Sequence, residues 1–81
     1  MTDQEILEKL REILLETFEI DPQRVHPEVN LFTELGLDSI DAVDLAIQLQ
    51  NLTGKRVQPD EFKDIRTVAN VIGAVHRLVA A

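Results

Sequence analysis

The stretch LGLDSIDAVDL, residues 35–45, decides how this chain folds around its only serine. Asp38 is a good N-cap and Asp41 stands three residues further on, so a helix is expected to begin at Ser39. The free backbone N–H groups and the dipole at a helix N-terminus favour an attached or bound phosphate. We therefore expect the Ser39 hydroxyl to project from the domain as an attachment point for a phosphate-linked prosthetic group.

A serine hydrolase does not fit the same residues. The Gly-x-Ser-x-Gly motif needs a glycine two residues after the serine, and Asp41 stands there. No pattern ties His26 or His76 to Ser39 as the base that a serine nucleophile needs. An ordinary helix-start serine, with no chemical role, remains the alternative from the residues alone.

Composition narrows the classes of protein. The 81 residues suit one domain, residues 1–81, and 15 acids against 8 bases give a formal net charge of -7. Nucleic acid is an unsuitable partner because phosphate binding needs clustered Lys and Arg. Without cysteine there is no disulfide, thiolate or Cys-ligated zinc. No apolar run approaches the ~20 residues of a membrane span and no signal peptide is visible, so we expect a cytoplasmic monomer.

The apolar periodicity predicts helices over 3–19, 39–52 and 68–79, with a short helix at 59–64 and a long loop over 20–38. Thr2 with Glu5 has the spacing of a capping box, Gly54 suits a helix C-terminus and Thr67 suits an N-cap. No strand pattern is present. The expected fold is an all-α bundle of three main helices plus one short helix.

Residues 35–45 resemble the 4′-phosphopantetheine attachment motif of acyl carrier proteins, and the expected order of helices and loops agrees with that family across the whole chain. The resemblance implies an acyl-carrier-like bundle in which Ser39 carries 4′-phosphopantetheine and Asp38 helps to position the attachment machinery. A phosphopantetheinyl transferase would attach the group from coenzyme A with magnesium, so Ser39 is modified rather than catalytic. The thiol of the arm would then hold acyl or polyketide chains as thioesters, and the chain itself would not be an enzyme.

The same resemblance implies a partner surface around Ser39. Asp41 and Asp44 match the acids of the family's recognition helix, which would meet basic patches on ketosynthase, ketoreductase, dehydratase and acyltransferase enzymes. No Lys or Arg occurs between Arg24 and Lys55, so this span carries charge of one sign. A solvated acidic helix face is the simpler alternative. The remaining expected interface residues are Ile40, Val43, Ile47, Glu34 and Leu37.

A cleft that shelters an acyl chain is also implied between the later helices. Ala42 and Ala46 are small and one helical turn apart, which leaves room beside the second main helix. Taken singly, each apolar residue in this group is equally well explained as core. The expected pocket residues are Leu31, Ala42, Ala46, Leu49, Val57, Phe62, Ile65 and Val71.

The chain departs from the usual pattern at the end of the helix over 39–52. Residues 48–52 read QLQNL where carriers of fatty acid synthesis usually continue with glutamates, and Lys55 and Arg56 follow. The acidic surface is therefore shorter than in a housekeeping carrier. This favours a dedicated carrier of a specialised pathway, such as an aryl polyene or other polyketide-type system. A peptidyl or aminoacyl carrier and an unmodified helical interaction domain remain the alternatives.

Overall fold

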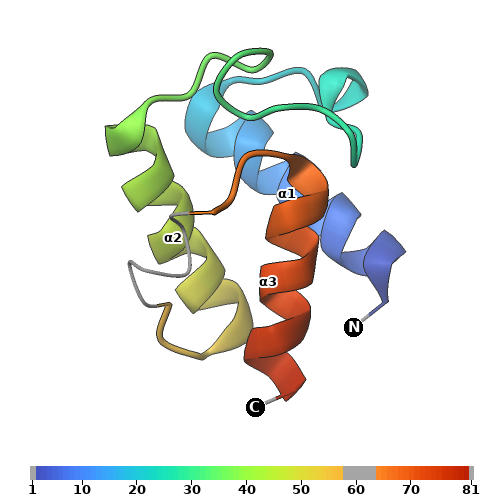
Figure 1. Ribbon diagram of the computed structural model, residues 1–81, viewed down its shortest axis with the longest axis vertical. Helices are drawn as coiled ribbons and strands as arrows, with labels where there is room; N and C mark the ends of the chain where they lie inside the picture. The colour runs from blue at the N-terminus through green and yellow to red at the C-terminus, as the bar shows by residue number, and fades with distance from the viewer. Residues whose placement is uncertain (1, 58–63, 81) are drawn as a thin grey trace.

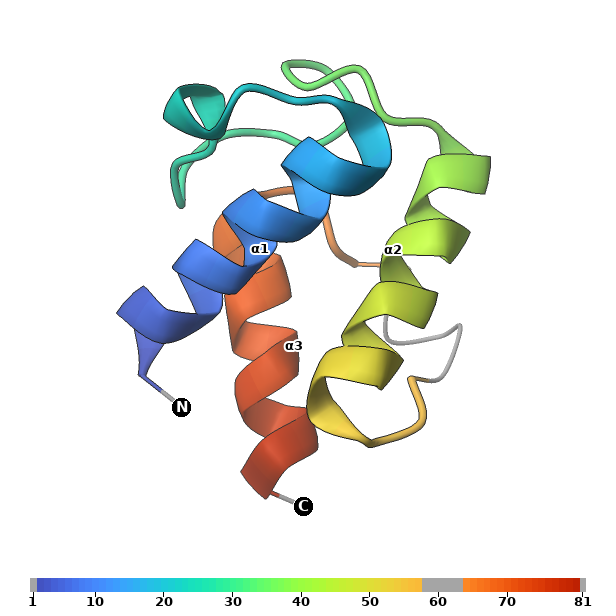
Figure 2. The same cartoon turned by 180° about the vertical axis from the view of Figure 1, so that it is seen from behind.

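The computed structural model describes residues 2–57 and 64–80, which form three α-helices and one 3₁₀ turn. Helix α1 spans Asp3–Phe18, the turn η1 spans Pro22–Arg24, α2 spans Ser39–Thr53 and α3 spans Val68–Ala80. Figure 1 and the reverse view in Figure 2 show α3 beside both α1 and α2, with the long loop crossing one end of the molecule. The all-α bundle is confirmed, whereas the short helix predicted over 59–64 falls almost wholly outside the described residues.

The predicted helix ends agree with the structure to within a residue because local capping fixes them. The Thr2 hydroxyl accepts a hydrogen bond from the Glu5 N–H, and the Glu5 carboxylate accepts one from the Thr2 N–H, which completes a capping box. Glu19 adopts a left-handed conformation with φ of 58° and stops α1 one residue earlier than expected. At α3, the Thr67 hydroxyl accepts from the Asn70 N–H, as expected of an N-cap.

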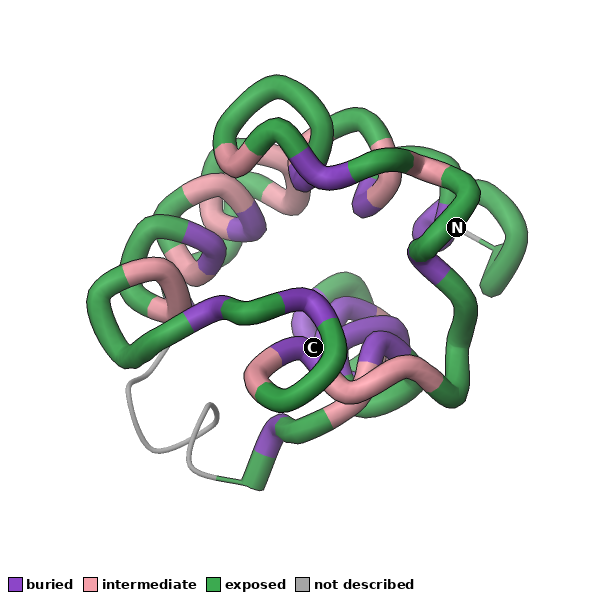
Figure 3. The backbone as a smooth tube through the Cα atoms, turned by 90° about the horizontal axis from the view of Figure 1, so that it is seen from above, coloured by how far each residue is buried: buried purple, intermediate pink, exposed green. Residues whose placement is uncertain are grey.

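The core lies where the three helices and the loop meet, as the buried segments in Figure 3 show. Every helix contributes side chains that are almost completely shielded from water, and so does the loop. The burial of this apolar surface is the main term that stabilises a domain of this size. The largest of these side chains are Ile6, Leu10, Leu14, Val25, Leu45, Leu49, Val68, Val71 and Val75.

The long loop is joined to the start of α3 through its backbone. Asn30 and Thr67 form an isolated antiparallel bridge, with Leu31 N–H donating to the Arg66 carbonyl over 2.8 Å. The Val68 N–H donates to the Val29 carbonyl over 3.0 Å. These bonds satisfy backbone groups that would otherwise be buried without partners, and they hold the loop over the core.

Two arginine side chains also hold the loop. The Arg11 side chain donates to the Val25 carbonyl over 3.1 Å, and Arg24 donates to the Glu34 carbonyl over 2.5 Å. Arg24 thereby fixes the loop shortly before Ser39.

None of the helices in the described part of the chain has the length and apolar character needed to cross a membrane.

Candidate functional site

Ser39 is held at the first position of α2 by the two acids that flank it. The Asp38 carboxylate accepts a hydrogen bond from the Asp41 N–H over 2.9 Å, and the Asp41 carboxylate accepts one from the Asp38 N–H over 3.2 Å. Gly36 has φ of 75°, which turns the chain into this cap. Ser39 is exposed, so its hydroxyl is open to a modifying enzyme.

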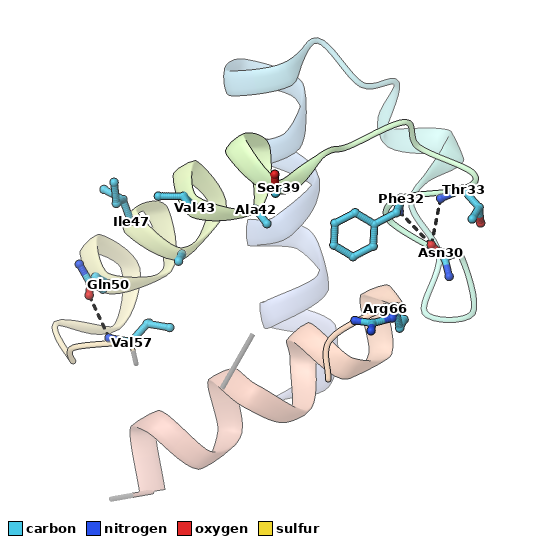
Figure 4. Close-up of a pocket in the computed structure, with 11 residues that line it drawn as sticks. Asn30, Phe32, Thr33, Ser39, Ala42, Val43, Ile47, Gln50, Val57 and Arg66 are labelled. Carbon is cyan, nitrogen blue, oxygen red and sulfur yellow. Dashed lines mark hydrogen bonds between the residues drawn. The ribbon is translucent and has the colours of Figure 1, made fainter. Parts of the chain in front are cut away.

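A largely apolar cavity of about 760 Å³ opens beside Ser39. Figure 4 shows Ser39, Ala42, Val43 and Ile47 following one another along α2. The ring of Phe32, which belongs to the loop, lies opposite Ser39 and Ala42. Further along, the Gln50 side-chain oxygen accepts a hydrogen bond from the Val57 N–H over 3.0 Å. The lining residues are Asn30, Phe32, Thr33, Ser39, Ala42, Val43, Ala46, Ile47, Gln50, Val57 and Arg66.

The structure divides the expected pocket residues into two groups. Ala42, Ala46 and Val57 line the cavity. Four others are instead buried in the core and do not line it, because they face the packed interior of the bundle; these are Leu31, Leu49, Ile65 and Val71. Phe62 lies outside the described residues.

Val43 and Ile47 line the cavity although they were expected only at the partner surface, and five further lining residues were missed from the sequence. Gln50 could have been found, because it continues the four-residue spacing of Ala42 and Ala46 along one side of α2. The others come from the loop and from the residues before α3, and no periodicity predicts them. They are Asn30, Phe32, Thr33 and Arg66.

The expected partner surface is laid out along the outer side of α2. Ile40, Val43 and Ile47 are 72%, 61% and 46% exposed, which is unusual for large apolar side chains. Asp44 and Glu34 are exposed, and Asp41 is half-buried in its cap. One residue needs correction: Leu37 is only 7% exposed because it packs into the core, so it is unsuited to partner contact.

The residues around Ser39 fit a phosphopantetheine group. The hydroxyl is exposed, it stands where a helix leaves backbone N–H groups without intrahelical partners, and an apolar cavity adjoins it. Within the described part of the chain, no group of three or more His, Cys, Asp or Glu residues could hold a metal ion.

A family model for the phosphopantetheine attachment site matches residues 8–75, which is most of the chain. The chain belongs to the acyl carrier protein family. It is similar to acyl carrier protein 2 of Ralstonia nicotianae, with 64% identity over the full length of both chains. The acyl carrier protein of Thermosynechococcus vestitus is 33% identical, again over the full length of both.

Solved structures agree with this assignment. The crystal structure of an acyl carrier protein from Thermotoga maritima matches with a TM-score of 0.86 and 31% identity, covering 96% of this chain and 91% of that one. The prediction of an acyl-carrier fold is therefore confirmed, as is the prediction of phosphopantetheine as the prosthetic group. The named relatives of this acyl carrier protein are themselves carriers.

Proposed function

We propose that Ser39 is the residue that carries the 4′-phosphopantetheine arm, and that this chain works as a discrete acyl carrier rather than as an enzyme. The observation that carries the proposal is the position of Ser39: it is exposed, it is the first residue of a capped helix, and it borders an apolar cavity. It is also the only serine in the sequence. When attached, the arm supplies a thiol that holds acyl chains as thioesters.

The test of the attachment site is a mass measurement. Wild type and Ser39→Ala are incubated with coenzyme A, magnesium and a promiscuous phosphopantetheinyl transferase, and the intact mass of each is measured. We expect the wild type to gain the mass of one phosphopantetheine and Ser39→Ala to gain nothing. A folded wild type that gains no mass, or a Ser39→Ala variant that gains the same mass, would contradict the assignment.

The cavity beside Ser39 is proposed to shelter the acyl chain, with Ala42, Ala46 and Val57 among its walls. Its apolar lining favours acyl over aminoacyl cargo, because a charged amine would lose hydration there without an acid to pair with among the described lining residues. The test is to load the carrier with acyl arms of increasing length and to measure the melting temperature. We expect longer chains to raise it, and Ala46→Leu, which narrows the cavity, to reduce that gain.

Partner enzymes are proposed to dock on the outer side of α2 around Ser39. Asp38, Asp41 and Asp44 give this end a negative potential, which suits the basic patches expected on the transferase and on ketosynthase, ketoreductase, dehydratase and acyltransferase partners. We propose that the carrier works in the cytoplasm as a monomer. The shorter acidic surface supports a specialised polyketide-type pathway over general fatty acid synthesis.

A further inference from the structure

One side of α2 carries an apolar ridge, which we define as Ile40, Val43 and Ile47, and Val43 and Ile47 also line the cavity. The three side chains are spaced at i, i+3 and i+7, so they form one row on the helix, and all three are exposed to solvent. No other described segment has three exposed large apolar side chains so close in sequence. An exposed apolar row of this kind is typical of a surface that binds another protein or a ligand.

The two ends of α2 carry charges of opposite sign. Asp38 caps the Ser39 end and Asp44 lies in the first half of the helix, while Lys55 and Arg56 follow its far end, directly after Gly54. All four residues are exposed. Residues 45–54 between the two ends carry no charge. The 15 residues of α2 separate the two ends by about 22 Å, because an α-helix rises 1.5 Å per residue.

These charges are available to a partner. Within the described residues, the ion pairs are Lys9 with Glu12 and His76 with Asp3, and the charged residues at the two ends of α2 take no part in them. About 22 Å exceeds the Debye length of about 8 Å at physiological ionic strength, so the two ends do not neutralise one another in solution. An approaching protein therefore meets a negative end and a positive end separately.

We infer that the docking face of this carrier is bipolar, and that it fits an enzyme surface with an apolar groove, basic residues at the Ser39 end and acidic residues about 20 Å further along. This inference rests on the proposed function. A docking surface that is basic along its whole length would be repelled by Lys55 and Arg56. The positive end thus selects partners and also fixes the direction in which α2 lies on them.

The first arm of the test uses a fatty acid synthesis ketosynthase whose docking surface is basic throughout. The carrier is loaded with a pantetheine arm that cross-links to the ketosynthase active site, and the cross-linking rate is measured at low and high salt. The variant is Lys55→Glu with Arg56→Glu. The control is Lys9→Glu with Arg77→Glu, which makes the same charge change at exposed positions on α1 and α3.

We expect the Lys55/Arg56 variant to cross-link about fivefold faster than the wild type at low salt, and this gain to disappear at high salt, because steering by exposed charges is screened. The control should change the rate by less than about twofold, since its charges lie away from α2. Equal changes in the variant and the control would indicate an effect of total charge, and would overturn the inference. An unchanged variant would do the same.

The second arm changes the ketosynthase. Two basic residues are replaced with glutamate at the end of its docking surface that meets the C-terminus of α2. The order should then reverse, with the wild-type carrier faster than the Lys55/Arg56 variant. A neutral variant, Lys55→Gln with Arg56→Gln, should lie between them in both arms, and it preserves the test if the reversed charges disturb the fold. An unreversed order would overturn the inference.

Loading is checked first by intact mass. Failure to load would overturn the proposed function together with this inference. If the carrier loads normally but substitutions at Lys55 and Arg56 leave the cross-linking rate unchanged, the inference alone would be overturned.

Discussion

The carboxylates of Asp38 and Asp41 each accept a hydrogen bond from the other residue's backbone N–H, so both acids beside Ser39 take part in the start of α2. A reading of these residues as partner contacts alone is therefore incomplete. Each carboxylate uses one oxygen in the cap, and its remaining lone pairs can face a basic partner. The same pair thus positions Ser39 and contributes charge around it.

Substitutions at Asp38 should separate these two roles. Asp38→Ala removes the cap and should lower the free energy of unfolding by about 1 kcal/mol. Asp38→Asn keeps an oxygen that can accept the Asp41 N–H, so its stability should stay near wild type while the rate of phosphopantetheine transfer falls. Chemical denaturation and a transfer assay on both variants provide the measurements. Equal stability of the two variants would contradict the capping role.

Two neighbouring residues of α2 should respond very differently to truncation. Leu49 is completely buried, so Leu49→Ala should cost about 2–5 kcal/mol of unfolding free energy through lost packing and the cavity left behind. Ile47 is 46% exposed, and Ile47→Ala should cost less than about 1 kcal/mol while slowing transfer and cross-linking. Urea denaturation compares the two. A large stability loss in Ile47→Ala would place that side chain in the core.

Alanine substitutions at Gly54 and Gly73 should change the free energy of unfolding in opposite directions. Gly54 has φ of 69° with no atom within 4 Å of an added Cβ, so Gly54→Ala should cost about 1 kcal/mol through backbone strain alone. Gly73 lies within α3, where an added Cβ would meet Arg77 Nη1 at 3.7 Å, an ordinary contact. Gly73→Ala should therefore raise the unfolding free energy by about 0.5–1 kcal/mol. Melting curves of both variants check the signs, and a shared sign would contradict this account.

Acid should weaken the start of α1. The Thr2 N–H donates to the Glu5 carboxylate, and this bond, with a contribution from the Thr2 side chain, lowers the pKa of Glu5 from its ordinary value of 4.5. Because folding favours the ionised form, its contribution is present above that value and is lost as the pH falls through the lowered pKa. The free energy of unfolding, measured against pH, should fall with acid in the wild type in this range. Glu5→Gln should lack this contribution to the fall. Parallel curves would contradict the prediction.

Salt should stabilise the domain. A net charge of -7 on 81 residues implies self-repulsion, which screening reduces. We expect added sodium chloride, or a millimolar divalent cation, to raise the melting temperature, with each 1 kcal/mol corresponding to about 4–8 °C. Thermal melts over a salt series provide the measurement, and a flat response would contradict the prediction.

Local signals in the sequence predicted the helices well. The ends of α1 and α2 depend on caps formed by residues three apart or by a left-handed residue. Residues close together in the sequence are therefore enough to predict where these helices begin and end. The 3₁₀ turn at Pro22–Arg24 follows in the same way from its proline and the Asp21 cap. The motif also predicted where Ser39 lies relative to α2.

The cavity wall and the burial of Leu37 depend on how the loop folds back on itself and on the start of α3. Arg66 reaches the cavity only because its carbonyl pairs with the Leu31 N–H, which brings the loop and the start of α3 together. The Leu37 N–H donates to the Leu31 carbonyl, and the Leu37 side chain is buried in the core. Pairings across many residues leave no period in the sequence, and so the acyl pocket was predicted only in part.

The backbone bridge between the loop and α3 has a consequence for how far the sequence can diverge. Its hydrogen bonds join peptide groups, which every residue except proline supplies in full. Exposed side chains of this loop, such as Thr33, can therefore be exchanged while Ser39 keeps its place, whereas Leu31 is fixed by its burial in the core. This agrees with a fold that superimposes on a relative in which more than two thirds of the amino acids differ. New specificity can evolve in the loop that faces the cavity without rebuilding the frame that presents the serine.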